Sequence, residues 1–218
     1  MKYKAVIFDL DGTLINSIED IADSMNTVLE NNNFPTHDYE AYKYFVGSGL
    51  KNLAQAALPI THNDEEQVNR CFESMLEVYN DNCINKTKPY DGIIELLDEL
   101  ISRNIKLGVL SNKTDEFTKK ITYALFPDYF EFVTGISEKT PKKPDPNGVL
   151  QMSKDLGIKP EDIIYVGDSG LDMQTANNAN MYAVGVLWGF RTREELVSNN
   201  AKYLLSHPLD LISILDNK

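Results

Sequence analysis

Short apolar runs of strand length alternate along most of the chain with amphipathic segments of helix length, and this alternation limits the possible folds more than any other sequence feature. The runs lie at residues 3–8, 105–110, 130–134, 163–166 and 182–186. They are apolar at consecutive positions, as in strands buried on both faces, and each ends in polar residues or glycine. This order predicts an α/β fold with a doubly wound, Rossmann-like parallel sheet and helices on both of its faces.

The segment that follows the first run interrupts the alternation, because it shows helical periodicity without a convincing strand. Ser17 and Asp20 have the spacing of a capping box, and apolar residues follow them at helical intervals. We therefore expect an all-helical cap domain inserted into the α/β core. The cap is predicted at residues 16–86, and the core at residues 1–15 and 87–218.

The formal net charge of −12 limits the partners of the chain. Duplex nucleic acid is bound mainly by Lys and Arg side chains that neutralise phosphates, so we expect no nucleic-acid partner. An anionic substrate must then be drawn by local cations or by a metal ion. We expect no membrane association, since no apolar run is long enough to span a bilayer and the N-terminal run meets Asp9 too early for a signal peptide.

The two cysteines, Cys71 and Cys83, lie in one polar helical stretch. A chain with so few cysteines is expected to keep them reduced, and we therefore predict a cytoplasmic location. The sequence leaves open whether the protein is a monomer or a homodimer.

Polar residues directly after the apolar runs are the candidate site, because ligands of an open parallel sheet bind at the carboxyl ends of the strands. Four clusters occupy such positions or lie just beyond them. They are Asp9 with Asp11, Ser111-Asn112-Lys113, Lys142-Lys143-Pro144, and Gly167-Asp168-Ser169 with Asp172.

The first cluster predicts a metal site. Asp9 and Asp11 leave the strand in a turn before Gly12-Thr13, so that two carboxylates approach one point. Crowded like charges are costly unless a cation lies between them. Mg²⁺ fits, because it binds a few carboxylate oxygens and retains water or phosphate oxygens, and Asp168 is the natural third carboxylate. The alternative is an ordinary Asp-Gly turn with Asp9 as a strand-end cap.

The other clusters supply candidate phosphate-binding groups. Ser111 precedes an expected helix, so its hydroxyl and the nearby backbone N–H groups could hold a phosphate, and a simple helix N-cap is the alternative. Lys143 precedes a proline that stiffens the chain and would direct the ammonium group inward. A solvated loop lysine is the alternative here, and Lys142 is the second candidate for the same role.

The last cluster combines glycines with two acids. Asp168 is expected to bind the metal, and Asp172, with Ser169, to orient the loop or to reach the metal through water. A helix N-terminus that carries acidic residues is the alternative.

Together the four clusters resemble the haloacid dehalogenase-like hydrolase superfamily, in its phosphatase branch with a helical cap. The resemblance covers essentially the whole chain. It is carried by Asp9-Leu10-Asp11-Gly12-Thr13, Ser111, Lys143-Pro144-Asp145-Pro146, and Gly167-Asp168-Ser169 with Asp172.

The resemblance implies a Mg²⁺-dependent, two-step phosphatase mechanism. Asp9 would attack phosphorus to form an aspartyl phosphate, and Asp11 would act as acid and then as base. Asp9, Asp168 and the backbone carbonyl of Asp11 would hold Mg²⁺. Gly12-Thr13 would form the turn that admits the phosphate, whose oxygens would be neutralised by Ser111, the amides near Asn112 and Lys143.

The resemblance also narrows the substrate. Asp11 argues against dehalogenases and phosphonate-cleaving relatives, which lack that acid. The loop with Gly47 and Gly49 looks like the one that faces the active site in phosphoglycolate phosphatases, although a helix-ending turn explains its glycines equally well. The segment from Val186 to Arg191 is also similar to that subgroup, but Trp188 itself is expected to be a core residue.

We therefore predict a small phosphorylated metabolite, most simply a phosphorylated acid resembling phosphoglycolate, as the substrate. Open alternatives are a pyrophosphatase, a sugar-phosphate or nucleotide phosphatase, and a β-phosphoglucomutase-like phosphotransferase. A non-enzymatic aspartyl-phosphate switch is disfavoured by Asp11, because an acid beside the nucleophile would hasten hydrolysis.

Overall fold

Six parallel strands form one sheet in the order β5-β4-β1-β6-β7-β8, and the computed structural model describes residues 2–216. The strands are β1 (Ala5–Phe8), β4 (Lys106–Thr114), β5 (Phe132–Ile136), β6 (Ile163–Gly167), β7 (Tyr182–Val186) and β8 (Tyr203–Leu205). Every neighbouring pair is parallel. The predicted doubly wound α/β fold is confirmed.

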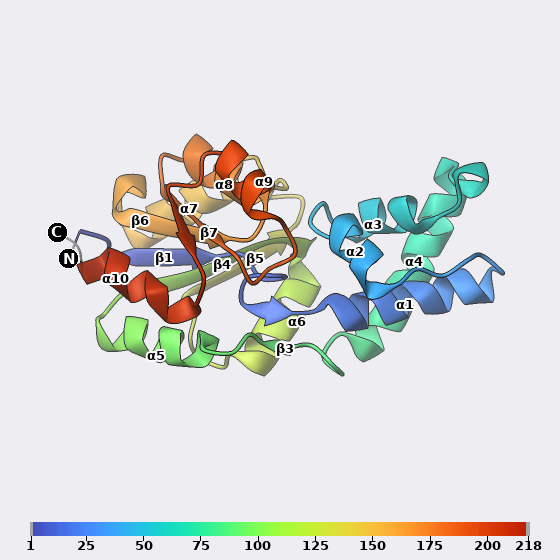
Figure 1. Cartoon of the computed structure of the whole chain (residues 1–218), viewed down its shortest axis with the longest axis horizontal. Coiled ribbons are helices and arrows are strands. Elements are labelled where there is room, and N and C mark those ends of the chain that lie inside the picture. Colours follow the sequence, from blue (N-terminus) through green and yellow to red (C-terminus); the bar gives the residue numbers. More distant parts are fainter. Residues whose placement is uncertain (1, 217–218) are drawn as a thin grey trace. The chain divides into compact units, whose positions relative to one another are not determined.

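Helices cover both faces of this sheet (Figure 1). They are α5 (Ile93–Ser102), α6 (Asp115–Leu125), α7 (Asn147–Leu156), α8 (Gly170–Asn178), α9 (Arg193–Ser198) and α10 (Leu211–Asp216). In Figure 1, α7, α8 and α9 lie on one side of the sheet, and α5 and α10 lie on the other. Strands buried on both faces must be apolar at consecutive positions, and the whole of β1 is buried accordingly.

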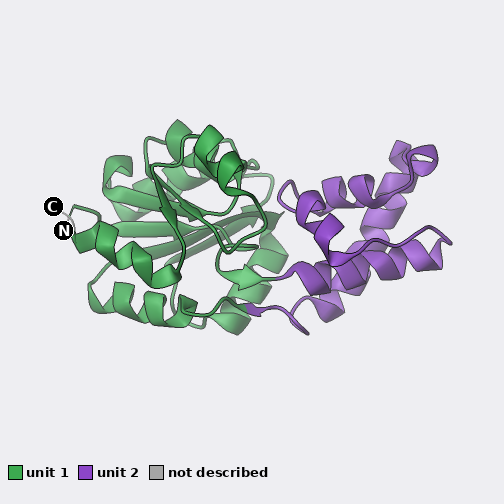
Figure 2. Ribbon diagram, viewed as in Figure 1, with its two compact units in different colours: residues 1–16, 89–218 green, residues 17–88 purple. Residues whose placement is uncertain are grey.

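The chain divides into two compact units, Met1–Asn16 with Pro89–Lys218 as unit 1 and Ser17–Lys88 as unit 2 (Figure 2). Unit 2 contains α1 (Ile18–Asn31), α2 (Tyr39–Phe45), α3 (Leu50–Ala57) and α4 (Glu65–Asn82), with a short 3-10 helix at Ile60–His62. The short strands β2 (Ile15–Asn16) and β3 (Lys88–Pro89) pair with each other. Whether unit 2 acts as a cap stays a prediction.

Unit 2 has its own core of apolar and aromatic side chains. Tyr42 is fully buried and donates a hydrogen bond to Asn26 Oδ1 at 2.7 Å, so its hydroxyl keeps a partner inside the core. Cys71 and Cys83 are buried and are not joined in a disulfide. In the part of the chain that the structure describes, no helix is both long and apolar enough to cross a membrane.

The predicted capping box at Ser17 and Asp20 is wrong. The Ser17 side chain makes no capping hydrogen bond to α1. The Asp20 carboxylate instead accepts hydrogen bonds from the backbone N–H groups of Lys86 and Thr87, at 2.8 to 3.0 Å. Tertiary donors from a segment more than sixty residues away have displaced the local interaction, and they tie the first turn of α1 to the last residues of unit 2.

The interpretation of Ser111 as a residue at a helix start is also wrong. Strand β4 continues through Thr114, and α6 begins at Asp115. Pairing with β1 ends at the register pair of Phe8 and Val109, so residues 111–113 extend beyond the end of β1. The strand therefore carries three polar residues past its neighbour, to the edge where ligands bind in such sheets.

Candidate active site

The strand order reverses around β1, which places the carboxyl ends of β4, β1 and β6 next to one another. Phe8 is in register with Val109 on one side and with Val166 on the other. Asp9 follows directly, and its backbone N–H donates to Val166 O at 2.8 Å. The topology therefore brings Asp9 beside the polar end of β4 and beside Asp168, the first residue after β6.

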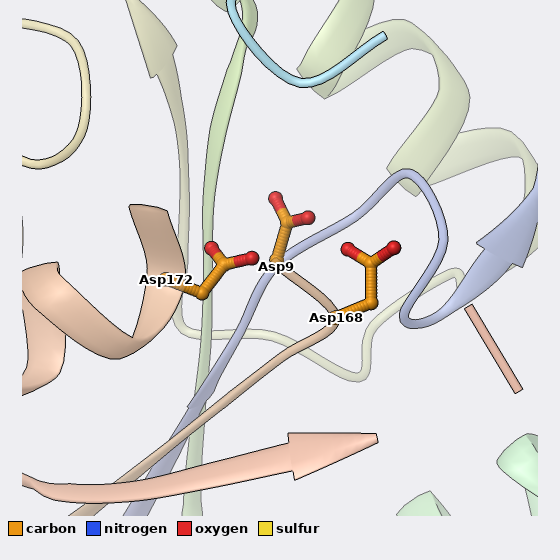
Figure 3. Close-up of side chains that lie close together, drawn as sticks. All are labelled: Asp9, Asp168 and Asp172. Carbon is orange, nitrogen blue, oxygen red and sulfur yellow. The ribbon is translucent and has the colours of Figure 1, made fainter. Parts of the chain in front are cut away.

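Three buried carboxylates meet at this point (Figure 3). Asp9 and Asp168 come from the loops after β1 and β6, and Asp172 comes from α8. One oxygen of each side chain lies within 4.8 Å of the others. Burial raises the pKa of Asp9 well above its usual range, and the charges of Asp172 and Asp168 add to the effect. Burial likewise raises the pKa of Asp168 to about 7, again with a contribution from Asp172.

Lys143 supplies a cation to this cluster. Its Nζ lies 2.6 Å from Asp9 Oδ1 and 2.7 Å from Asp172 Oδ1, and the side chain is almost completely buried. Burial acts to lower the pKa of Lys143, but the charges of Asp172 and Asp9 outweigh it and hold the pKa well above its usual range. Lys142, the second candidate from the sequence, is exposed. The geometry thus favours Lys143 for the phosphate-binding role.

Asn112 fixes the backbone beside that lysine. Its Oδ1 accepts a hydrogen bond from Lys143 N at 2.7 Å, and its Nδ2 donates to Lys143 O at 3.4 Å. The Asn112 side chain therefore positions the backbone of Lys143, and a contact of the amides near Asn112 with the substrate stays a prediction. Ser111 is buried next to it, and its Oγ accepts from Lys113 N at 3.1 Å.

Asp172 orients Lys143 and is a poor candidate for a metal ligand. Its Oδ1 accepts hydrogen bonds from Lys143 Nζ and from the Tyr165 hydroxyl, the latter at 3.2 Å. Its Oδ2 accepts from Ser169 N at 3.0 Å and from Ser169 Oγ at 2.6 Å. Four donors fill the approximately four acceptor sites of a carboxylate. Asp172 and Ser169 also form the capping box of α8.

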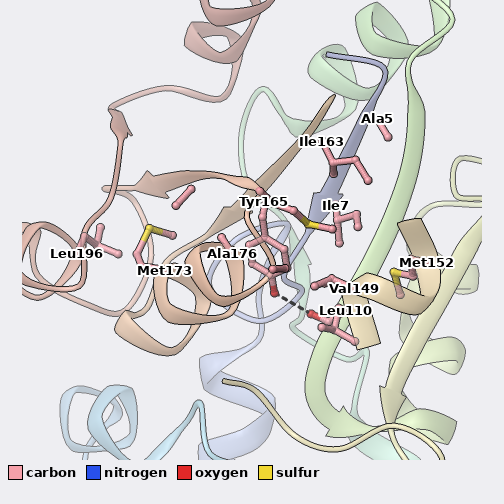
Figure 4. Close-up of a cluster of buried hydrophobic side chains, with 13 residues drawn as sticks. Ala5, Ile7, Leu110, Val149, Met152, Ile163, Tyr165, Met173, Ala176 and Leu196 are labelled. Atoms are coloured by element: carbon pink, nitrogen blue, oxygen red, sulfur yellow. Dashed lines mark hydrogen bonds between the residues drawn. The ribbon is translucent and has the colours of Figure 1, made fainter. Parts of the chain in front are cut away.

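Tyr165 links this network to the interior of unit 1. The residue lies in β6, within a hydrophobic cluster that includes Ile7, Val149 and Met173 (Figure 4). Figure 4 also shows its hydroxyl directed at Leu110 O, 3.5 Å away. Burial raises the pKa of Tyr165 well above its usual range, so the side chain remains a neutral hydrogen-bond donor to Asp172. Because Tyr165 lies within the apolar run of β6, nothing in the sequence indicated this role.

The donor set that remains fits Mg²⁺. Asp9 and Asp168 are carboxylates at the ends of adjacent strands, and oxygen ligands of this kind are those that Mg²⁺ prefers. Burial and the neighbouring carboxylates raise their pKa values, and a divalent ion between them would supply compensating positive charge. Asp9, Asp168 and the backbone carbonyl of Asp11 are thus the candidate ligands, as the resemblance implies.

The Asp11 side chain is held apart from the three-carboxylate cluster. Its Oδ1 forms an ion pair of 2.9 Å with Lys113 Nζ, and the two side chains are 11% and 2% exposed. Lys113 lies in one of the four clusters that the sequence indicated, but its pairing with Asp11 was not predicted. Tyr90 was missed altogether: burial raises its pKa, and the charges of Asp168 and Asp11 contribute.

The turn after Asp11 approaches the carboxylates closely. Gly12 has a φ of +85°, and a Cβ at this position would lie 2.4 Å from Asp168 Oδ2, so glycine is required. Thr13 is buried, and its Oγ1 has no hydrogen-bond partner among the residues that the structure describes. An unsatisfied buried hydroxyl at the turn suits a site that receives a polar ligand.

The remaining predicted contacts, Gly47 and Gly49, lie in unit 2. Both have positive φ angles, +114° and +92°, and Gly49 directly precedes α3. Such angles fit the turn between α2 and α3 by themselves. A contact of these glycines with a substrate stays a prediction.

Comparisons with known proteins show the family to which the chain belongs. Residues 6–186 match the family model described as haloacid dehalogenase-like hydrolase. The chain belongs to this family of hydrolases. Within the family it is a phosphoric monoester hydrolase of the phosphoglycolate phosphatase-like type.

The similar proteins cover the whole chain. A phosphoglycolate phosphatase of Aquifex aeolicus is 33% identical over 98% of this chain and 97% of its own length. An N-acetylmuramic acid 6-phosphate phosphatase of Pseudomonas aeruginosa is 28% identical over 99% and 96%. A crystal structure from Lactobacillus delbrueckii subsp. bulgaricus, provisionally named a phosphoglycolate phosphatase, superposes with a TM-score of 0.93 and 30% identity over 100% of both chains.

Proposed function

We propose that the chain is a Mg²⁺-dependent phosphatase that hydrolyses a small phosphorylated acid through an aspartyl-phosphate intermediate. The observation that carries the proposal is the buried cluster of Asp9, Lys143 and Asp168 at the carboxyl ends of adjacent strands. A nucleophile, a cation and a candidate metal ligand lie together there, in a setting where burial strengthens electrostatic interactions.

In the first step, a carboxylate oxygen of Asp9 attacks phosphorus, and the bond from phosphorus to the leaving oxygen breaks as Asp11 gives that oxygen a proton. In the second step, water attacks the aspartyl phosphate, Asp11 accepts a proton from the water, and phosphate leaves Asp9. The ammonium group of Lys143 has three N–H donors, of which two meet Asp9 and Asp172. The third is suited to a phosphoryl oxygen.

Two further groups of the chain complete the phosphate site in this proposal. The hydroxyls of Ser111 and Thr13 donate hydrogen bonds to the phosphoryl oxygens, since both side chains are buried. Ser111 lies in the part of β4 that extends beyond β1, and Thr13 lies in the turn after Asp11. Bound Mg²⁺ supplies additional positive charge against the developing negative charge. Positioning and charge stabilisation then account for most of the catalysis.

The substrate class rests on the relatives and on Lys113. Phosphoglycolate and N-acetylmuramic acid 6-phosphate are the substrates in the names of two of the relatives. In both compounds the phosphate is on a hydroxyl group, and the molecule also carries a carboxylic acid. Lys113 places a buried cation beside Asp11, on the side where the leaving group is expected. We expect this reaction in the cytoplasm, with unit 2 as a cap whose Gly47 and Gly49 contact the substrate.

The test is release of inorganic phosphate, with and without Mg²⁺, from a panel of phosphoglycolate, pyrophosphate, a hexose phosphate and a nucleotide. We expect Mg²⁺-dependent hydrolysis, with the phosphorylated acid cleaved at the highest kcat/KM. The variant Asp9→Asn serves as the control for contaminating phosphatase. Equal rates in the wild type and in this variant would refute the proposal, and a preference for another panel member would refute the substrate class alone.

A further inference from the structure

A loop that no part of the proposed mechanism uses lies directly against the carboxylate cluster. It comprises Leu187 to Phe190 and follows β7, the neighbour of β6 in the sheet. Val166 is in register with Val184, and Gly167 with Gly185. The loop therefore leaves the sheet at the edge where Asp168 leaves β6.

The backbone of this loop binds Asp168. Phe190 N donates a hydrogen bond to Asp168 Oδ2 at 2.7 Å. A backbone donor holds a carboxylate in one orientation without the freedom of a side-chain donor. One carboxylate oxygen of Asp168, the candidate metal ligand, is therefore held by the loop.

Gly189 brings the same loop into close contact with both sides of the site. A Cβ at this position would lie 2.3 Å from Asp168 Cβ and 2.5 Å from Gly12 O. Real Cβ atoms do not approach other atoms so closely, so even a methyl group would displace Asp168 or the turn at Gly12. On the opposite side, a Cβ at Gly12 would lie 2.9 Å from Phe190 Cδ2.

Trp188 fixes the loop to the nucleophile turn by a third contact. Its indole Nε1 donates to Thr13 O at 3.0 Å. The side chain is half-buried, so the expectation that Trp188 is a plain core residue is corrected by its polar contact. Trp188 contacts the turn at Thr13, and Phe190 contacts the turn at Asp168. The loop thereby joins two turns that are 155 residues apart in the chain.

We propose that the Leu187–Phe190 loop is a positioning element of the Mg²⁺ site, which holds Asp168 and the Gly12-Thr13 turn in register with Asp9. This inference rests on the proposed function, because it takes Asp168 to be a metal ligand. Groups that orient metal ligands typically change metal affinity by about 10 to 100 fold when they are altered. The loop contacts Asp168 through the backbone N–H of Phe190 and the Gly12-Thr13 turn through the indole N–H of Trp188, so its effect acts on metal affinity.

The experiment compares Mg²⁺ binding by isothermal titration calorimetry in the wild type, Gly189→Ala and Trp188→Phe. The matched control is Gly108→Ala, because a Cβ on Gly108 would meet its neighbours at ordinary distances of 3.5 to 3.7 Å. We expect Gly189→Ala to weaken Mg²⁺ binding at least about tenfold and Trp188→Phe by a smaller factor, with Gly108→Ala close to the wild type. Thermal unfolding without metal checks that each variant is folded.

The outcomes separate the inference from the proposed function. If the wild type binds Mg²⁺ and both loop variants bind it equally well, the inference is overturned and the proposed function stands. If the wild type binds no Mg²⁺, both are overturned. If Gly189→Ala does not fold, Trp188→Phe decides, since it removes one N–H group and retains an aromatic ring: weaker Mg²⁺ binding supports the inference, and unchanged binding overturns it.

Discussion

Both units of the molecule bury carboxylates, but they neutralise them in different ways. In unit 2, Asp20 accepts three hydrogen bonds from the backbone N–H groups of Lys86 and Thr87. In unit 1, Asp9, Asp168 and Asp172 lie close to one another, and Lys143 forms ion pairs with two of them. Backbone donors stabilise Asp20, whereas two of the three acids of unit 1 share one lysine.

This difference separates a structural acid from a functional one. Backbone donors meet the needs of a carboxylate without any ligand, and they stabilise the chain around it. Crowded acids whose pKa values are raised destabilise the protein unless a cation or a substrate relieves them. Perturbed groups of this kind concentrate at functional sites. The predictions below test whether the two kinds of buried acid behave as differently as their partners imply.

The largest effect is expected for Asp9→Asn. The amide cannot act as the nucleophile, so we expect phosphate release to fall by at least about 10³-fold, the scale seen when a catalytic group is removed. Asn removes one of the three crowded acids while Lys143 keeps Asp172 as its ion-pair partner, so the Tm without Mg²⁺ should stay the same or rise. Phosphate release and thermal unfolding measure the two effects. A variant that loses stability and activity together would remove the contrast with Asp20.

The next effect is expected for Lys143→Met, which leaves Asp9 and Asp172 without their shared cation. Removal of one partner of a buried ion pair typically costs about 3–5 kcal/mol of the free energy of unfolding. We expect a loss of this size in urea unfolding without Mg²⁺, together with loss of activity. Lys142→Met is the matched control. Because Lys142 is exposed, its removal should change neither the free energy of unfolding nor the activity. Equal behaviour of the two variants would contradict the assignment of Lys143.

For Asp20, the expected effect falls on stability alone. Asp20→Ala leaves the backbone N–H groups of Lys86 and Thr87 without their acceptor, and the Thr87 group is buried, so we expect a loss of about 1–3 kcal/mol. Asp20→Asn retains an acceptor oxygen and should lose less. Urea unfolding measures the loss, and kcat at a temperature where the variant is folded should stay within about tenfold of the wild type. A collapse of kcat in Asp20→Asn would show that this acid also serves catalysis.

A smaller and more selective effect is expected for Lys113→Met. The ion pair with Asp11 holds the proposed proton donor in place, and a poor leaving group depends on that donor more than a good one does. We expect kcat/KM to fall by about 10 to 100 fold for an alkyl phosphate and by less for 4-nitrophenyl phosphate.

Two further variants make the Lys113 experiment decisive. Lys113→Arg retains the positive charge and should recover part of the alkyl phosphate activity. Asp11→Asn should show the same dependence on the leaving group. Equal losses on both substrates in Lys113→Met would indicate a general structural role for the pair.

The sequence predicted most of unit 1 because strands buried on both faces leave continuous apolar runs, and the acids at their ends stand out. The expected topology placed Asp9 and Asp168 at one edge of the sheet, and the family resemblance added Lys143 to the same site. It could not place Tyr165, Lys113 or Trp188, because their roles depend on which distant group each one faces. The Ser17 capping box failed for the same reason: backbone donors near Thr87 reached Asp20.

The smallest effect concerns the pH dependence of Mg²⁺ binding, and it tests the raised pKa of the functional acids directly. Burial raises the pKa of Asp168 to about 7 in the metal-free protein, and the pKa of Asp9 shifts in the same direction. A carboxylate must lose its proton before it binds a metal ion. Protonation of Asp168 alone should therefore lower Mg²⁺ affinity about tenfold for each pH unit below 7, and protonation of Asp9 should steepen the fall. Calorimetry in buffers of different ionisation enthalpy should detect about one released proton or more at pH 6 and fewer at pH 8.5. An affinity that is flat between these values would mean that Asp168 is already ionised, and the acids of the two units would then differ in their partners but not in their protonation.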